Sequence, residues 1–335
     1  MNNKRYAWKS NRIVALDVLK FVATLAIFNH MAARFYGSAP YLGTGGVVGC
    51  ALFFFCSGYA LALGKMGRFD VWYKRRLMRI WPTSFTAALV YGLTLGGGGD
   101  VIYALQGSGW FVTCILVHYL AYYILDMVFR HNTKHIFLFA VTVSIVSFVF
   151  WQPGDRDAYW ILGGYSKWVQ YFILFAFGAL MGKTRDNGVR LGPTANVVGL
   201  LVSFALVYAC YFSLLGSFGM PRFGFLAKAQ WIMLLPIVGM AYFAFCIADC
   251  EAFGRFVEGR SLYRIVVFIG GLSLEMFLIG RVTTKLLPAW RWPLGWISAL
   301  LATIACSYLA RAFGRLFAQT FDRATDGYDL RAAFR

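Results

Sequence analysis

The chain has 335 residues, of which 60% are hydrophobic and only 14% are charged, and its formal net charge is +18 at pH 7. Soluble domains contain about 45–50% apolar and about 25% charged residues, so this composition excludes an ordinary soluble globular protein. Apolar runs near the length that crosses a bilayer recur throughout the sequence. We therefore expect an all-α, polytopic membrane protein.

About ten transmembrane helices are predicted along the chain. The expected spans are residues 13–35, 42–64, 80–96, 109–129, 135–151, 168–182, 192–215, 227–248, 265–287 and 293–313. Residues 315–335 are expected to form a short cytoplasmic tail. The whole chain, residues 1–335, is thus predicted to be a single membrane-embedded domain.

The basic residues are distributed unequally between the two sides of these spans. With the N-terminus inside, most of the 32 Lys and Arg residues fall in cytoplasmic segments, as the positive-inside rule requires. Both termini are therefore predicted to be cytoplasmic. We attribute the excess positive charge to membrane topology and contact with anionic lipid, and we expect no nucleic-acid partner.

The first predicted span contains Asp17, Lys20 and His30 in an otherwise apolar sequence. Ionisable groups inside a membrane are costly unless they face protein, water or a partner charge. Asp17 and Lys20 are three residues apart, so they can pair in the inner half of the membrane. His30 lies about 27 Å beyond Arg12 on a helix, in the outer half. Because histidine exchanges a proton near neutral pH, His30 is either a catalytic residue or a hydrogen-bonded packing residue.

The second span carries the tripeptide Ser57-Gly58-Tyr59, which places a small residue between two hydroxyl groups. Small residues allow close helix packing in membranes, so packing is one interpretation of this motif. The other is that Ser57 and Tyr59 contribute polar groups to a site.

A dense basic stretch, WYKRRLMRIWP, precedes the third span at residues 72–82. On a helix, the spacing of Arg75, Arg76 and Arg79 predicts that their guanidinium groups cluster, and such groups suit phosphate oxygens. The alternative is a positive-inside signal beside anionic lipid.

Polar residues in the predicted outer loops are weaker candidates. Asp155 and Asp157 are either contacts for carbohydrate or part of a solvated loop, and Trp110 either stacks on a sugar or anchors the membrane interface. None of the seven cysteines forms a Cys-x-x-Cys pair, so no zinc site or disulfide framework is indicated. We expect no metal and no permanently bound cofactor.

Several of these segments together resemble a known family. The matching segments, in order, are RIVALDVLKFVATLAIFNH, FFFCSGYALALGK, RRLMRIWP and GWFVTCILVHYL, with weaker matches at FILFAFGALMGK and LSLEMFLIGR. Their order and spacing are similar to those of the acyltransferase-3 family of bacterial integral-membrane O-acyltransferases. The resemblance covers most of the chain.

The resemblance implies transfer of an acyl group, usually acetyl, from cytoplasmic acyl-CoA to an envelope carbohydrate at the bacterial inner membrane. It also implies that His30 is the essential histidine of the first helix and that Arg75, Arg76 and Arg79 lie near the donor. Ser57, Tyr59 and Glu275 are expected to orient the reacting groups, whereas Asp17 and Lys20 support the inner half of the site.

Two positions depart from the family pattern. In the family about ten residues usually separate the basic residue from the histidine, whereas here nine separate Lys20 from His30, which turns the two side chains roughly 80° apart. Either the helix is locally distorted or Lys20 does not act with His30. The other departure is Gly280, where many relatives carry histidine.

Two other classes of function compete with the enzyme. A transporter or flippase for a glycan, lipid or small polar solute also suits intramembrane charges, and glycines at Gly43–Gly46 and Gly270–Gly271 are candidates for helix breaks. A structural subunit that binds lipid-linked glycans is the third class. The acceptor sugar, the acyl chain and the oligomeric state are not determined by the sequence.

Overall fold

The structure is a computed structural model that describes residues 13–95, 110–150, 166–185, 191–215, 230–258, 261–288, 290–320 and 329–334. Throughout these ranges the ordered elements are α-helices and short 3-10 turns, without a strand. The predicted all-α class is confirmed.

Most of the longer helices follow the predicted spans, but the span expected at 265–287 is divided between two helices, α12 and α13, that bend by 74° at their break. They are α1 (Val14–Met31), α2 (Gly46–Leu63), α3 (Phe69–Leu95), α5 (Trp110–Val128), α6 (Thr133–Phe150), α7 (Ser166–Thr184), α8 (Pro193–Leu215), α10 (Leu234–Ala248), α13 (Ser273–Leu286) and α14 (Leu294–Gln319). The shorter elements are η1 (Ala33–Tyr36), η2 (Pro40–Leu42), η3 (Gln230–Met233), α11 (Glu251–Glu258), α12 (Leu262–Gly271) and α15 (Leu330–Ala333).

In the described part of the chain, five helices are long and apolar enough to cross a membrane: α1, α2, α5, α8 and α14. Two further pairs pass the same test together, α10 with α11 and α12 with α13, although they bend by 70° and 74° at their breaks. The structure therefore supports a multi-pass membrane protein with five to seven spans. The count of ten spans and the cytoplasmic position of both termini remain predictions.

Helix α3 differs most from its predicted span. It begins at Phe69, well before residue 80, and runs without a break through the basic stretch and through Pro82. Although it is 27 residues long, α3 is not among the helices that are apolar enough to cross a membrane. The basic stretch and the segment after it form one continuous helix.

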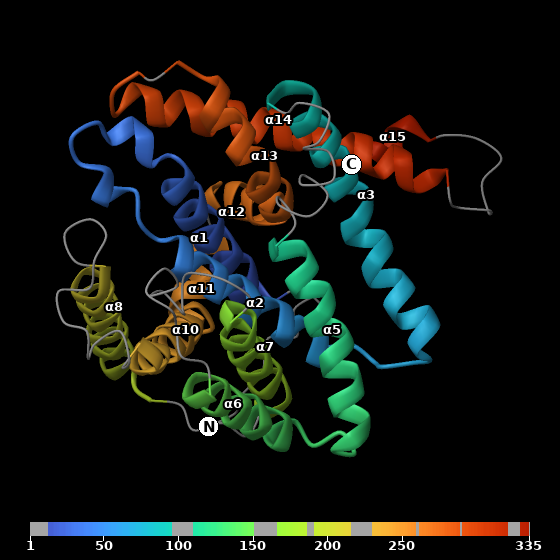
Figure 1. The fold of residues 1–335 in the computed structure, drawn as a ribbon, viewed down its shortest axis with the longest axis vertical. Helices are drawn as coiled ribbons and strands as arrows, with labels where there is room; N and C mark the ends of the chain where they lie inside the picture. Colours follow the sequence, from blue (N-terminus) through green and yellow to red (C-terminus); the bar gives the residue numbers. More distant parts are fainter. Residues whose placement is uncertain are drawn as a thin grey trace.

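Helices α1 and α2 lie at the centre of the bundle (Figure 1). Helix α2 makes its most extensive contact with α7, and α1 packs against α2, α12 and α13. Helices α3, α13 and α14 form one group, while α8 packs on α10 at another side. Helix α1 therefore contacts both groups, through α13 and through α10, while α2 contacts α10.

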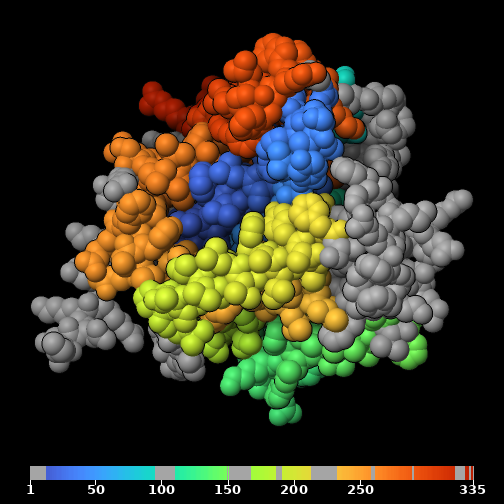
Figure 2. Space-filling model, turned by 90° about the vertical axis from the view of Figure 1, so that its left-hand side faces the viewer, coloured from blue at the N-terminus to red at the C-terminus, as the bar shows by residue number. Residues whose placement is uncertain are grey.

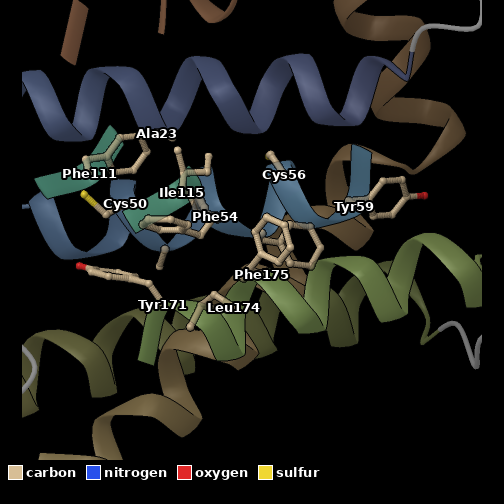
Figure 3. Packing of buried hydrophobic residues seen from close by; sticks show 14 of the residues in the cluster. Ala23, Cys50, Phe54, Cys56, Tyr59, Phe111, Ile115, Tyr171, Leu174 and Phe175 are labelled. Atoms are coloured by element: carbon tan, nitrogen blue, oxygen red, sulfur yellow. The ribbon is translucent and has the colours of Figure 1, made fainter. Parts of the chain in front are cut away.

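The contact between α2 and α7 is close because each helix places a glycine against the backbone of the other. A Cβ atom at Gly58 would lie 1.8 Å from the carbonyl oxygen of Phe175, and one at Gly178 would lie 2.0 Å from that of Phe55. Figure 3 shows Phe175 and Tyr59 in this densely packed interface. Since small residues allow such an approach in membranes, Gly58 supports the packing interpretation of the Ser57–Tyr59 motif.

Candidate active site

His30 lies in the last turn of α1, beside the loop that leads to α2. Its Nδ1 atom is 3.1 Å from the carbonyl oxygen of Gly43. Because a carbonyl oxygen can only accept a hydrogen bond, Nδ1 is the donor, and in the neutral ring Nε2 keeps its lone pair. His30 is exposed at this end of the bundle, which we call the histidine end. The contact fixes the orientation of the ring and leaves Nε2 without this partner.

The loop against His30 is built from glycines because there is no space for side chains. A Cβ atom at Gly43 would lie 2.3 Å from Cβ of Ala33, and one at Gly46 would lie 2.8 Å from Cδ2 of His30. Gly45 has a φ of 104°, a conformation that favours glycine. These residues were candidates for a helix break, and the structure shows that they form the wall against which the histidine lies.

Asn29, the neighbour of His30, holds this loop in place. Its Nδ2 atom donates to the carbonyl oxygens of Leu42, at 2.8 Å, and Thr44, at 3.0 Å. These residues flank Gly43, so the two hydrogen bonds position the carbonyl group that His30 contacts. Asn29 is a positioning residue that the sequence analysis missed, although its place beside His30 in an apolar helix was a usable signal.

A second polar group lies near Glu275, at the start of α13. Glu275 is buried, and its Oε1 atom is 3.8 Å from Nε of Arg311 on α14. Its Oε2 atom has no hydrogen-bond partner among the described residues. Arg315 and Arg79 also lie within electrostatic range of this carboxylate. A single carboxylate thus faces three arginines, so positive charge remains in excess at this arginine end.

Close packing of α3 against α14 brings these arginines together. A Cβ atom at Gly314 would lie 2.8 Å from Oγ1 of Thr83 and 3.0 Å from its Cα atom. Thr83 is one turn from Arg79, and Gly314 adjoins Arg315. The sequence analysis missed Arg311 and Arg315, whose spacing of four residues at the end of an apolar helix was the available signal.

The arginines of α3 have different neighbours. The guanidinium carbon of Arg76 lies 5.4 Å from the ring centre of Trp72 and 5.3 Å from that of Tyr119 on α5, so it stacks on two aromatic rings. Arg79 lies within electrostatic range of Glu275, and Arg75 is exposed. Their clustering around a phosphate group stays a prediction.

Asp17 and Lys20 lie well away from His30. Helix α1 is continuous from Val14 to Met31, so Lys20 is about 15 Å below His30 along the axis. A Cβ atom at Gly270 would lie 2.9 Å from the carbonyl oxygen of Asp17 and 3.6 Å from Cβ of Lys20, so α12 packs against this part of α1. An uninterrupted helix favours the second explanation of the shortened spacing, in which Lys20 does not act with His30.

Gly280 lies beside the histidine end. A Cβ atom there would be 3.0 Å from Sδ of Met31 and 3.7 Å from Cγ2 of Thr303. A larger side chain at this position would therefore point at the residue that follows His30. Met31 and Thr303 therefore border the space next to Gly280.

Comparison with known families adds to this geometry. The sequence model of the acyltransferase-3 family, described as an acyltransferase domain, matches residues 13–312. The chain belongs to the acyltransferase-3 family. It is therefore a membrane acyltransferase, and the matched range includes His30 and, of the arginine end, Arg79, Glu275 and Arg311. Neither a curated protein nor a solved structure matches the chain.

The contacts of the remaining predicted site residues of this acyltransferase do not point to a ligand. Tyr59 is fully buried, with its ring centre 4.9 Å from that of Phe245, and Ser57 is half-buried. Nζ of Lys167 lies 4.0 Å from the ring centre of Trp110, so this cation already occupies one face of the indole. Their proposed contacts with donor or sugar remain predictions. Asp155 and Asp157 lie outside the described residues.

No group of three or more His, Cys, Asp and Glu side chains in the described ranges is arranged to hold a metal ion. The polar groups described above are one histidine held against a loop at one end and a buried carboxylate facing three arginines at the other.

Proposed function

We propose that this acyltransferase moves an acyl group, acetyl in the simplest case, from cytoplasmic acyl-CoA to a hydroxyl group of an envelope polysaccharide or lipid-linked sugar. The protein would act in the bacterial inner membrane, with the arginine end toward the cytoplasm and the histidine end toward the envelope. In this orientation the donor and the acceptor reach the bundle from opposite sides.

The observation that carries the proposal is the orientation of His30. Its Nδ1 atom contacts the Gly43 carbonyl, which leaves Nε2 as the basic atom at the exposed end of α1. An acyl transfer to a hydroxyl group requires such a base, because the acceptor oxygen must lose its proton as it attacks. A histidine that served only for packing would not need an accessible Nε2 atom.

In the proposed reaction the acceptor hydroxyl gives its proton to Nε2 of His30. The acceptor oxygen forms a bond to the thioester carbonyl carbon, and the carbon–sulfur bond then breaks. The CoA thiolate leaves and takes up the proton from the imidazolium. Arg79, Arg311 and Arg315 hold the CoA phosphates, since guanidinium groups bind phosphate oxygens in a bidentate manner.

A covalent route uses the same residues. Nε2 of His30 attacks the thioester carbonyl carbon first, and the carbon–sulfur bond breaks as the CoA thiolate leaves. The acyl-imidazolium then passes its acyl group to the acceptor hydroxyl, whose proton goes to the thiolate, and the neutral histidine is restored. This order suits a donor and an acceptor that do not occupy the site together. Mass spectrometry of the protein after incubation with acetyl-CoA alone would distinguish the routes, because only the covalent one acetylates His30.

The proposal is tested with purified protein in lipid nanodiscs, acetyl-CoA labelled in the acetyl group, and envelope glycan from a strain that lacks this protein. We expect label in the glycan and free CoA in equal amounts. Absence of transfer by wild-type protein with every acyl-CoA and glycan fraction offered would contradict it. Mass spectrometry of the product then identifies the acyl group and its position.

A second candidate, a transporter or flippase, rests on the two broken helix pairs. Breaks of 70° between α10 and α11 and of 74° between α12 and α13 resemble the discontinuous helices that transporters place around a substrate. Reconstituted protein would in that case move a lipid-linked glycan across a vesicle membrane in the absence of acyl-CoA. The acyltransferase proposal expects no such movement.

A further inference from the structure

The histidine end contains a hollow of about 580 Å³, within the size range of small-molecule sites. Its walls come from two segments that are far apart in the sequence. Phe35, Tyr36, Ser38 and Leu42 belong to the loop after α1, whereas Arg291 and Trp292 precede α14. In Figure 2 the blue N-terminal segment lies against the red-orange C-terminal helices on one face of the molecule.

Hydrogen bonds hold the two walls together. The backbone N–H of Trp292 donates to the carbonyl oxygen of Phe35 at 2.8 Å. Asn29 accepts at Oδ1 from the hydroxyl of Tyr36, at 2.5 Å, and from Nε1 of Trp296, at 3.1 Å. The hollow is therefore built into the fold, and the residue that ties it together is the neighbour of His30.

A further pair of hydrogen bonds links the loop after α1 to the end of α13. The two terminal nitrogens of Arg34 donate to the carbonyl oxygens of Lys285, at 3.1 Å, and Leu287, at 3.0 Å. Arg34 thus fixes the end of α13 to the loop after α1. A preformed site of this kind loses little freedom when a ligand binds.

Among the described residues that line the hollow, Arg291 is the charged one. Arg34 adjoins Phe35 of the first wall, and Lys285, at the end of α13, supplies a carbonyl group that Arg34 contacts. Neither residues 18–69 nor residues 276–321 contain an Asp or Glu. In the proposed orientation these cations lie on the side of the membrane where the positive-inside rule disfavours them, so topology does not account for them. The electrostatic potential here suits an anion.

The hollow also offers an aromatic surface. Trp292 lines the hollow and is 59% exposed. Tyr36 lines it from the other segment, the loop after α1. An exposed indole can cover the apolar face of a ring-shaped ligand, while Arg291 contacts its charged substituent. Small-molecule sites commonly combine aromatic walls with a few oriented polar groups in this way.

We propose that this hollow is the acceptor subsite and that it takes an anionic sugar, a unit that carries a carboxylate or a phosphate group. The proposal rests on the proposed function. Leu42 lines the hollow, and the next residue, Gly43, is the contact of His30. His30 does not itself line the hollow, but a sugar held on Trp292 and Arg291 would lie against the loop whose next residue contacts the histidine.

The test measures binding directly, with wild-type protein in nanodiscs of neutral phosphatidylcholine. The probes are methyl glucuronide, glucose 1-phosphate and uncharged methyl glucoside. The affinity of each probe is measured by saturation-transfer NMR. We expect at least one anionic probe to bind about 10-fold more tightly than methyl glucoside, because charge-assisted hydrogen bonds are stronger than neutral ones. Preference for methyl glucuronide assigns a uronic acid, and preference for glucose 1-phosphate assigns a sugar phosphate.

Variants locate the binding. Arg291→Gln should lower the affinity for the anionic probe about 10-fold or more and leave that for methyl glucoside nearly unchanged, while Arg291→Lys should retain part of the preference. Trp292→Ala should weaken both. Trp290→Ala is the matched control, because this tryptophan in the same loop is 56% exposed but does not line the hollow.

Equal binding of charged and uncharged probes by wild-type protein would overturn the proposal, as would normal anionic binding by both Arg291→Gln and Trp292→Ala. Acetyl transfer is measured separately on the same preparations. Site-specific binding without any transfer contradicts the proposed function and leaves the anionic subsite standing. Transfer that is unaffected by both variants contradicts only the subsite.

Discussion

Nδ1 of His30 lies 3.1 Å from the carbonyl oxygen of Gly43, and this contact determines which ring nitrogen is free to act as a base. The contact depends on residues that are not themselves reactive. Asn29 holds the loop on either side of Gly43, and Gly46 leaves room for the ring. The catalytic power that we assign to His30 is therefore a property of the loop as much as of the histidine.

His30→Ala should abolish most acyl transfer while leaving acyl-CoA binding intact. General-base catalysis contributes about 10²–10⁴-fold, so a loss of that size is expected in the transfer rate. The rate is measured with labelled acetyl-CoA, and donor binding by calorimetry on the same folded protein. His30→Gln serves as a polar control and should be similarly inactive. Near-normal transfer by either variant would remove His30 from the mechanism.

Gly46→Ala should lower transfer although the substituted residue carries no reactive group. The new Cβ atom would lie 2.8 Å from Cδ2 of His30, so the ring must move. Misplacement of a catalytic group by about 1 Å can cost about 10²-fold, and we expect a fall of about 10- to 100-fold in kcat with an unchanged KM for the donor.

Gly67→Ala is the matched control for Gly46→Ala, because nothing lies within 4 Å of the Cβ atom that it would add. This loop variant should behave as wild type. If Gly46→Ala were equally active, the position of the His30 ring against the loop would not matter for the reaction.

Arg79→Gln and Arg315→Gln should each raise the KM for acyl-CoA. Hydrogen bonds to charged groups contribute about 1.5–3 kcal/mol, which corresponds to about 10- to 150-fold in donor efficiency. Arg76→Ala should instead mainly lower the stability of the protein, since Arg76 stacks on Trp72 and Tyr119. Steady-state kinetics with varied acetyl-CoA provide the measurement.

The control for the arginine variants is Arg68→Gln. Arg68 is exposed and pairs with Asp70 at 2.9 Å, so its loss should leave donor kinetics unchanged. Normal donor kinetics in Arg79→Gln and Arg315→Gln as well would reduce the arginine end to a signal for membrane topology.

Gly58→Ala should destabilise the protein without touching either polar end. Its Cβ atom would lie 1.8 Å from the carbonyl oxygen of Phe175, so α2 and α7 must separate, at a cost of about 1–3 kcal/mol. Thermal unfolding in detergent should show a lower Tm. Gly254→Ala, in helix α11 with nothing within 4 Å of the added atom, should not lower it. Equal Tm values would mean that this contact is not tight.

Cysteine labelling tests the orientation of the bundle. In intact cells a membrane-impermeant thiol reagent should label Ser38→Cys, at the histidine end, and should reach Lys74→Cys only after permeabilisation. Asp157→Cys is also predicted to be labelled from outside. Wild-type protein supplies the background from the seven native cysteines. Labelling of Lys74→Cys alone in intact cells would reverse the orientation.

The sequence by itself determined that this is an all-α membrane protein and singled out His30 as a candidate catalytic residue. The apolar composition excludes an ordinary soluble fold, because a chain with so many apolar residues must place many of them against lipid. The positions of Asp17, Lys20 and His30 in an apolar helix indicated α1 as a candidate for function, because ionisable groups in a membrane span are energetically costly. The order of the motifs was sufficient to indicate the family that the match to residues 13–312 then showed.

Only the tertiary structure decided which residues act together. Helical spacing predicted that Arg75, Arg76 and Arg79 lie together. In the structure Arg76 packs on the rings of Trp72 and Tyr119. Near Glu275, α14 adds Arg311 and Arg315 to Arg79. Contacts between segments that are hundreds of residues apart, such as Phe35 with Trp292, leave no periodic signal in either segment. The sequence determines what each helix can carry, whereas the packing of helices against one another decides what each side chain meets.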